Sequence, residues 1–271
     1  MKKTLISFCR IIFSCYFLSC VALYFYQENF IFFPQKLDSD YQFNFSSGFE
    51  GLSFEELNFE ASDGTSLNGL LFKADNSKGL IFYLHGNAGS LSSWGDVAEV
   101  YLKLNYDVFI VDYRGYGKSE GSITSEEQLF ADNQLIYNEL KQNYREKDII
   151  ILGYSLGTGL AAKLASQNQP KQLILQAPYY SLTYIMQQMF PLIPTFLLKY
   201  KFATHEFLND CNMPITIFHG NDDRVIHYES SLKLKEQFNH KINLIVLQGQ
   251  GHNGMTDNPD YQLKLIDILL E

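Results

Sequence analysis

The residues Ile149-Ile150-Ile151-Leu152-Gly153-Tyr154-Ser155-Leu156-Gly157 decide the fold of this 271-residue chain. The apolar run at their start is typical of a strand buried on both faces of a sheet. The pattern Gly-x-Ser-x-Gly follows at once and opens a stretch with helical spacing, residues 156–167. Strand, tight turn and helix in this order are the setting of a nucleophile elbow. We therefore predict that Ser155 is a nucleophile, and that the Leu156 backbone N–H at the helix start serves an oxyanion hole.

Apolar runs of the same kind recur on both sides of this stretch and alternate with segments of helical spacing. An earlier pair of strand-like segments, 55–60 and 67–73, flanks Asp63-Gly64 and predicts a hairpin. The alternation indicates an α/β fold: a mostly parallel sheet with helices on both faces. Functional side chains of such sheets lie on loops at the carboxyl ends of strands. The remaining predicted strands are 79–84, 107–111, 148–152, 172–175, 214–218 and 243–247, and the remaining helices are 125–144, 229–238 and 260–270.

Composition describes a globular protein, with 46% hydrophobic and 19% charged residues. Residues 34–271 are enough for one domain with its own core. The net charge of -9 argues against nucleic acid as a partner, because that would need a dense basic surface. Cys211 is the only cysteine of this part, and no C-x-x-C pair is present. We therefore expect neither an intradomain disulfide nor a metal site.

The first 33 residues differ from the rest and predict a membrane anchor. An apolar and aromatic run from residue 5 to 26 is interrupted only by Arg10, and about 20 such residues span a bilayer. The aromatic end of the run suits the membrane–water interface better than a signal-peptidase site. Cleavage and lipidation at Cys20, or a buried helix of a soluble protein, are the alternatives. Lys2, Lys3 and Arg10 predict a cytoplasmic N-terminus and a periplasmic or luminal domain.

A second loop after a predicted strand, Leu84-His85-Gly86-Asn87-Ala88, has the form of a turn that supplies an oxyanion-hole amide. The backbone N–H of Asn87 is the better candidate donor and that of Ala88 the second. The alternative is a glycine-rich loop without a catalytic part.

A nucleophilic serine needs a histidine base and an orienting carboxylate. His252, between Gly251 and Asn253 just past the last predicted strand, is the candidate base. The acid is expected in the loop after the strand 214–218, where Asp222 and Asp223 stand side by side and chemistry alone does not choose between them. The other five histidines are expected to be structural or exposed: His85, His205, His219, His227 and His240.

Five motifs occur together in one order: His85-Gly86-Asn87-Ala88, Asp112-Tyr113-Arg114-Gly115-Tyr116-Gly117-Lys118-Ser119, Gly153-Tyr154-Ser155-Leu156-Gly157-Thr158, His219-Gly220-Asn221-Asp222-Asp223 and Gly251-His252. From about residue 20 onward the chain thereby resembles the membrane-tethered α/β-hydrolase-domain family. This family is close to serine aminopeptidase-like and lysophospholipase-like hydrolases and to protein depalmitoylases.

The resemblance implies the α/β-hydrolase fold and a catalytic triad of Ser155, Asp223 and His252, without a cofactor. It also implies that Asp112, Arg114 and Gly117 form a structural turn. Many relatives carry an acidic residue shortly after the histidine, where this chain has Asn253 and Gly254. That departure affects the loop and leaves the triad intact.

The implied activity is hydrolysis of acyl esters or thioesters through an acyl-enzyme, on a small-molecule or lipid-like substrate. A serine peptidase of the same fold is one alternative, and a non-catalytic binding or scaffold protein is another. Residues 178–210 replace one crossover and predict a short cap rich in aromatic and aliphatic residues. These residues either pack on the sheet or form an apolar wall for an acyl chain.

Overall fold

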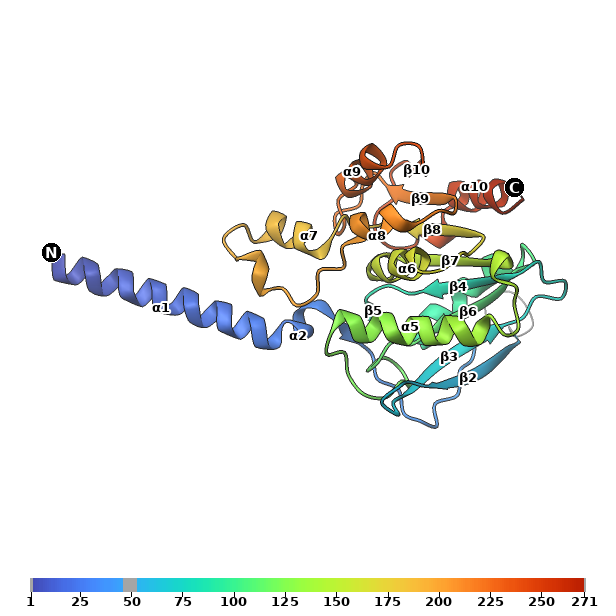
Figure 1. Ribbon diagram of the computed structural model, residues 1–271, viewed down its shortest axis with the longest axis horizontal. Coiled ribbons are helices and arrows are strands. Elements are labelled where there is room, and N and C mark those ends of the chain that lie inside the picture. The colour runs from blue at the N-terminus through green and yellow to red at the C-terminus, as the bar shows by residue number, and fades with distance from the viewer. Residues whose placement is uncertain (1, 46–52, 271) are drawn as a thin grey trace.

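The computed structural model describes residues 2–45 and 53–270, and its centre is an eight-stranded sheet with the order β10-β9-β8-β7-β4-β6-β3-β2 (Figure 1). Met1, residues 46–52 and Glu271, which belong to the expected anchor and domain, lie outside the described residues. β3 pairs antiparallel with β2 and β6, and all pairs from β6 to β10 are parallel. The strands are β2 (Phe54–Glu60), β3 (Ser66–Phe72), β4 (Leu80–Leu84), β6 (Asp107–Val111), β7 (Ile149–Tyr154), β8 (Gln172–Gln176), β9 (Ile215–Gly220) and β10 (Ile242–Leu247).

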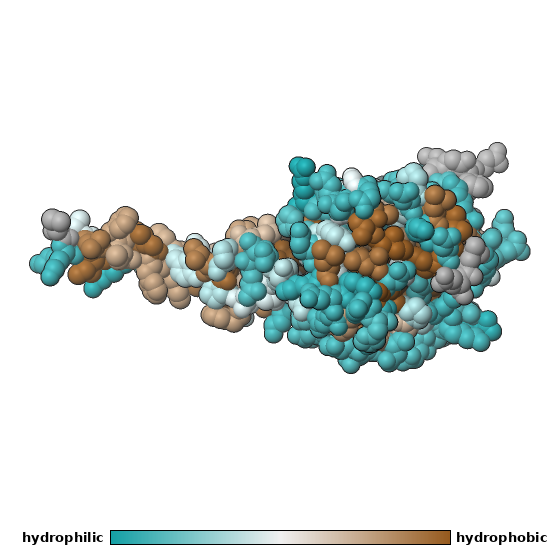
Figure 2. All heavy atoms as spheres, turned by 90° about the horizontal axis from the view of Figure 1, so that it is seen from above, coloured by the Kyte–Doolittle hydropathy of each residue, from teal (hydrophilic) through white to brown (hydrophobic). Residues whose placement is uncertain are grey.

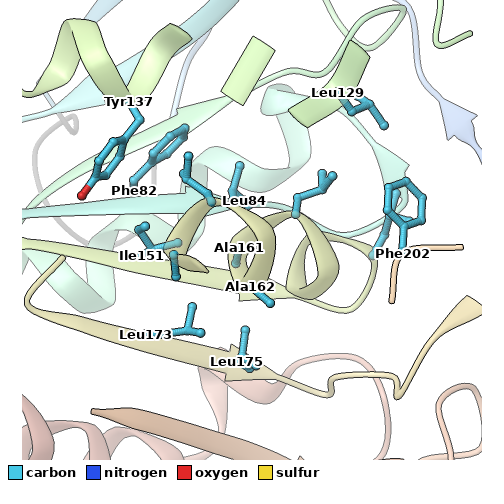
Figure 3. Close-up of a cluster of buried hydrophobic side chains, with 14 of the residues drawn as sticks. Phe82, Leu84, Leu129, Tyr137, Ile151, Ala161, Ala162, Leu173, Leu175 and Phe202 are labelled. Atoms are coloured by element: carbon cyan, nitrogen blue, oxygen red, sulfur yellow. The ribbon is translucent and has the colours of Figure 1, made fainter. Parts of the chain in front are cut away.

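Both faces of the sheet are covered, as the alternation of segments predicted. One core cluster joins the sheet to α5 (Glu126–Leu140), α6 (Leu156–Ser166), α8 (Thr204–Asp210) and α9 (Glu229–Gln237). The other joins it to α3 (Leu91–Trp94), α4 (Ala98–Leu102) and α10 (Pro259–Leu270). Figure 3 shows Ala161 and Ala162 of α6 beside Ile151, Leu173 and Leu175 of the sheet. Small side chains on this helix face bring α6 close to the central strands.

The α/β-hydrolase fold expected from the sequence is confirmed, with element ends shifted by a few residues. The predicted hairpin is the pair β2–β3, in which Phe54 lies opposite Phe72 and Glu60 opposite Ser66. The predicted helix 125–144 is shorter, since α5 ends at Leu140. Ser125 caps its start by accepting a hydrogen bond from the Gln128 amide at 3.1 Å.

The helix α1 (Lys2–Tyr26) projects from the domain, and none of its residues is buried (Figures 1 and 2). Its length and its mean hydropathy of 1.9 over the best 18-residue window fit a helix that crosses a membrane. The residues that follow it already pack on the domain: α2 (Glu28–Ile31) leads into β1 (Phe33–Pro34), which pairs with β5 (Ala88–Gly89). Gln27 and Phe32 are buried, with 1% and 6% of their surfaces exposed. Packing on the domain therefore begins before residue 34.

Between β8 and β9 the chain makes the excursion expected as a cap. It consists of α7 (Leu182–Met189), a 3₁₀ turn η3 (Thr195–Leu197) and α8. Its two ends pack on the domain, where Tyr179, Tyr200 and Phe202 are fully buried. Its middle does not, since Met189, Phe190, Leu192 and Phe196 are exposed. Of the two alternatives left open for the aromatic and aliphatic residues of this segment, packing on the domain therefore applies to its ends.

Candidate active site

Ser155 lies at the turn between β7 and α6, with φ +49° and ψ -114°. A positive φ is strained for a residue with a side chain, and such strain persists only where the surroundings fix it. Here the Ser155 amide donates to the Gln176 carbonyl at 2.9 Å, and Thr158 Oγ1 donates to the Ser155 carbonyl at 2.6 Å. The turn holds the serine side chain at the carboxyl edge of the sheet.

Glycine at position 157 lets the start of α6 approach the end of β4. A Cβ atom there would lie 2.0 Å from the Leu84 carbonyl oxygen and 2.7 Å from that of His85. Both neighbours are backbone, so they cannot move away as a flexible side chain would. The start of α6 and the end of β4 therefore pass close to each other, which brings the loop after β4 next to Ser155.

The structure brings Ser155, His252 and Asp223 together. His252 Nε2 lies 2.9 Å from Ser155 Oγ, and His252 Nδ1 lies 2.7 Å from Asp223 Oδ2. A carboxylate beside Nδ1 favours the tautomer that carries its proton there, so Nε2 faces the serine as an acceptor. Asp222 is more than half exposed and lies 3.5 Å from Arg224, away from the histidine. The geometry thus favours Asp223 over its neighbour.

Asp223 is held on all sides by hydrogen-bond donors. Its Oδ1 accepts from the amides of Val225 and Ile226 at 2.8 and 2.9 Å. Its Oδ2 faces a second histidine, His219, whose Nε2 lies 3.3 Å away. Burial raises the pKa of this carboxyl, but the hydrogen bonds from His219 and His252 outweigh burial and hold the pKa well below its usual range. The carboxylate stays charged.

The part of His219 was missed by sequence reasoning, which grouped it with the structural histidines. Its ring is fully buried, with Nδ1 2.6 Å from Ser231 Oγ and Nε2 2.8 Å from the Ile226 carbonyl. The carbonyl can only accept, so Nε2 carries the proton and can also reach Asp223. The spacing of four residues between His219 and Asp223 across a tight turn was the available signal.

The side chain of Asn87 ties the loop after β4 to the segment that follows α1. Its Oδ1 accepts from the Phe33 amide at 3.2 Å and from the Tyr116 hydroxyl at 3.0 Å, and its Nδ2 donates to the Ile31 carbonyl. Within residues 2–45 and 53–270, the backbone N–H groups of Asn87 and Leu156 have no intramolecular hydrogen-bond partner. Both amides predicted for an oxyanion hole are therefore unpaired. Ala88, the second candidate, lies in β5 opposite Phe33.

His85 and Asp112 are fully buried beneath this loop. His85 Nδ1 donates to the Gly86 carbonyl at 2.6 Å, and its Nε2 lies 3.7 Å from Asp112 Oδ1. Burial lowers the pKa of His85 to about 4 and raises that of Asp112 to about 8, so the pair is mainly uncharged at neutral pH. A Cβ at position 117 would lie 1.8 Å from Asp112 Oδ2. Only glycine fits there, which agrees with a structural turn at residues 112–119.

In the described part of the chain, no group of three or more His, Cys, Asp or Glu side chains is arranged to hold a metal ion. His205 stacks on Tyr180 with 4.1 Å between ring centroids, and His227 and His240 are exposed.

An elbow after the central strand, followed along the chain by an acid and a histidine at later strand ends, defines the class: the chain belongs to the α/β-hydrolase-domain proteins. Residues 75–205 match the family model described as serine aminopeptidase, S33. The chain is 30% identical over 227 residues to lysophosphatidylserine lipase ABHD12 of Danio rerio, which covers 72% of this chain and 59% of that protein. It is 31% identical over 184 residues to human alpha/beta hydrolase domain-containing protein 17B, covering 66% and 62%.

The chain thus spans about three fifths of the length of these two curated relatives. Among solved structures, it is similar to the esterase Pf2001 of Pyrococcus furiosus with a TM-score of 0.65 and 21% identity. That likeness covers 85% of this chain and 98% of the esterase, and it concerns the fold alone.

Proposed function

We propose that this protein is a membrane-anchored serine hydrolase that cleaves acyl esters or thioesters through a covalent acyl-enzyme. The proposal rests on one observation: a line of hydrogen-bond contacts runs from Asp223 through His252 to the Ser155 hydroxyl, at a strand–helix turn. The match to a hydrolase family and the similarity to a named lipase support the reaction class. A lipid-like acyl substrate agrees with an apolar helix joined to the domain.

In this mechanism His252 removes the proton from Ser155 Oγ as the oxygen attacks the substrate carbonyl carbon. Asp223 holds the Nδ1–H tautomer and stabilises the imidazolium that forms. His252 then donates the proton to the leaving group as the carbonyl–heteroatom bond breaks. Water, activated by the same histidine, attacks the acyl-serine ester and releases the acid. Every proton is returned, and the mechanism as proposed requires no cofactor.

The tetrahedral intermediate carries its negative charge on the former carbonyl oxygen. The unpaired amides of Asn87 and Leu156 are the proposed donors to this oxygen, the latter at the start of α6 where the helix dipole also favours an anion. A donor of this kind contributes roughly 3 kcal/mol to the transition state. Residue 157 must stay a glycine for both amides to face one point.

Residues 1–33 are the proposed anchor and 34–271 the catalytic domain, with 178–210 as its cap. The helix is proposed to stay uncleaved, because the aromatic end of the apolar run lacks a signal-peptidase site. Lys2, Lys3 and Arg10 support a cytoplasmic N-terminus with the domain on the opposite, periplasmic or luminal side.

Labelling by a fluorophosphonate tests the serine chemistry. The full chain in detergent is expected to be labelled, and Ser155→Ala is expected to abolish the label while the protein remains folded by circular dichroism. A folded wild-type chain that takes no label would contradict the enzyme proposal and favour a non-catalytic binding protein. Turnover of short and long p-nitrophenyl acyl esters, compared with a peptide amide, then separates an esterase from a peptidase. A clear preference for the amide would overturn the ester assignment.

A further inference from the structure

The middle of the cap exposes large apolar side chains far from the sheet. Leu192 and Phe196 are 82% and 81% exposed, more than any other large apolar residue in the described part of the chain. Met189 and Phe190 of the same segment are more than half exposed. Residues 189–197 are called the apolar tip below. Clustered exposure of this kind on a soluble surface marks an interaction site.

The apolar tip lies against α1, on the side from which the helix leaves the domain (Figure 1). The Tyr16 hydroxyl of α1 donates a hydrogen bond to the Leu192 carbonyl of the tip. Beside this contact, an open groove of about 490 Å³ lies between α1 and the tip. Its walls are aromatic and aliphatic, with Phe13, Phe17 and Tyr24 on one side and Pro194 and Phe196 on the other. The tip is therefore exposed to the same medium, water or lipid, as the middle of α1.

The position of Tyr16 along α1 indicates how deep the apolar tip would lie in a membrane that α1 spans. Tyr16 precedes the end of α1 at Tyr26 by ten residues, which is roughly 15 Å along a helix axis. The hydrocarbon core of a bilayer is about 30 Å thick. If α1 spans the membrane, Leu192 beside Tyr16 lies below the membrane surface and not above it.

Charged residues are absent from the tip and are present beside the end of α1. Residues 178–198 contain no Asp, Glu, Lys or Arg in a chain in which 19% of residues are charged. Charges return just past the tip, where Lys199 Nζ lies 3.0 Å from Glu28 and 5.1 Å from the ring centre of Tyr24. This group stands at the end of α1, where lipid headgroups would lie if α1 spans the membrane.

Several backbone polar groups of the tip are absent or already hydrogen-bonded. This suits a medium without water, where each unpaired polar group costs free energy. Pro191 and Pro194 have no N–H, and the amides of Phe190 and Ile193 donate to the Met186 and Phe190 carbonyls at 2.7 and 3.0 Å. The Leu192 carbonyl accepts from Tyr16.

Further along the tip, Leu197 N–H donates to the Pro194 carbonyl at 3.2 Å. The amides of Leu192, Thr195 and Phe196 have no hydrogen-bond partner within residues 2–45 and 53–270. These three unpaired amides are a cost of inserting the tip, because the hydrocarbon core offers them no acceptor.

We propose that the apolar tip inserts into the bilayer that α1 enters, with lipid as the partner of this surface. The inference rests on the anchoring of α1 in the proposed function and extends it, because the domain then contacts the membrane at two places. The cap is held at the lipid surface, and its groove opens toward acyl chains.

Tryptophan quenching by lipids brominated on their acyl chains tests this insertion. The full chain is reconstituted in phosphatidylcholine vesicles with and without bromine, as wild type and as Leu192→Trp and Phe196→Trp. The wild-type signal from Trp94, the single native tryptophan, is subtracted. In vesicles without bromine, we expect the emission of both added tryptophans to be blue-shifted. In brominated vesicles, we expect this emission to be quenched. Leu263→Trp, at a 63% exposed position of α10 on the far side of the domain, is the matched control and should keep its emission.

Phe17→Trp in α1 reports on the anchor separately. Quenching at position 17 without quenching at 192 or 196 would overturn the tip proposal and leave the anchor standing. The absence of quenching at all three positions would overturn both.

Discussion

At the scale of single residues, Asp223 has more hydrogen-bond partners than its proposed role of orienting His252 requires. Two backbone amides bind one carboxylate oxygen, and two histidine rings face the other. A carboxylate with so many donors is fixed in orientation as well as in charge. The direction in which His252 points toward Ser155 therefore depends on the buried ring of His219 on the far side of the acid.

Replacing His219 by alanine is expected to reduce kcat for ester hydrolysis by roughly tenfold, since a hydrogen bond to a charged group contributes about 1.5 kcal/mol. His219→Gln, which can still donate to Asp223, is expected to recover part of the loss. Steady-state kinetics with a p-nitrophenyl ester measure both variants. His240→Ala, at an exposed position, is the control. Equal kcat in wild type and His219→Ala would show that the two amides suffice to hold Asp223.

At the scale of elements, Arg114 joins three segments that are distant in the sequence. Its guanidinium makes two hydrogen bonds to Asp132 of α5, at 2.6 and 2.9 Å. On its other side it donates to Asp63 and Thr65 in the β2–β3 turn, at 2.7 and 2.8 Å for the Nη1 atom. The arginine itself is 4% exposed. The hairpin at the sheet edge is thereby attached to the helix layer and to the turn that supports the loop of Asn87.

Arg114→Ala leaves the buried Asp132 carboxylate without its cation and is expected to lower the free energy of unfolding by about 3 kcal/mol. Arg145→Ala is the matched control. Its ion pair with Asp148 is also an arginine–aspartate contact, at 2.5 Å, but the arginine side chain is 73% exposed, so a change below about 1 kcal/mol is expected. Urea unfolding of both variants measures the difference. Similar values for the two would mean that Asp132 finds other partners.

At the scale of the whole molecule, the segment after α1 is part of the domain's packing. Phe32 is buried, with edge-to-face contacts to Tyr200 and Phe202 at 5.1 and 6.5 Å between ring centroids. Gln27 donates to the Leu197 carbonyl at 3.2 Å and accepts from the Lys199 amide at 2.9 Å. The helix, the cap and the loop of Asn87 therefore meet at residues 27–33.

Two neighbouring phenylalanines test this arrangement. Phe32→Ala removes a buried aromatic ring and is expected to destabilise the protein by about 3 kcal/mol. Phe33→Ala removes a ring that is 54% exposed and is expected to change stability by less than about 0.5 kcal/mol. Thermal unfolding of the full chain in detergent compares the two. A small effect of Phe32→Ala would mean that the domain folds independently of this segment.

The elements were predictable wherever a local pattern determined them. The run 149–152 and the glycines around Ser155 identify strand, turn and helix by periodicity and steric requirement. The strand ends place His252 and the pair Asp222–Asp223 at one edge, and the choice of Asp223 came from the family resemblance alone. The second histidine at Asp223 and the anchoring of the Asn87 side chain were not predictable, because each depends on contacts between segments distant in the sequence. The packing of Phe32 was missed for a related reason: an apolar residue after a membrane-like helix has the same pattern whether it contacts lipid or protein.

The burial of Gln27 directly after α1 has a consequence for how a substrate is found. A hydrolase on a flexible tether samples a volume around its attachment point, so the height of its active site above the membrane varies over a wide range. If α1 is the proposed anchor, the contacts of Gln27 with the cap link the orientation of the domain, and with it the height of Ser155 above the bilayer, to the orientation of the helix. A substrate that diffuses within the membrane would then meet the enzyme by two-dimensional diffusion, with the active site always presented at the same orientation. Under the proposed function, substrates whose scissile bond lies at another height above the bilayer would then be cleaved more slowly.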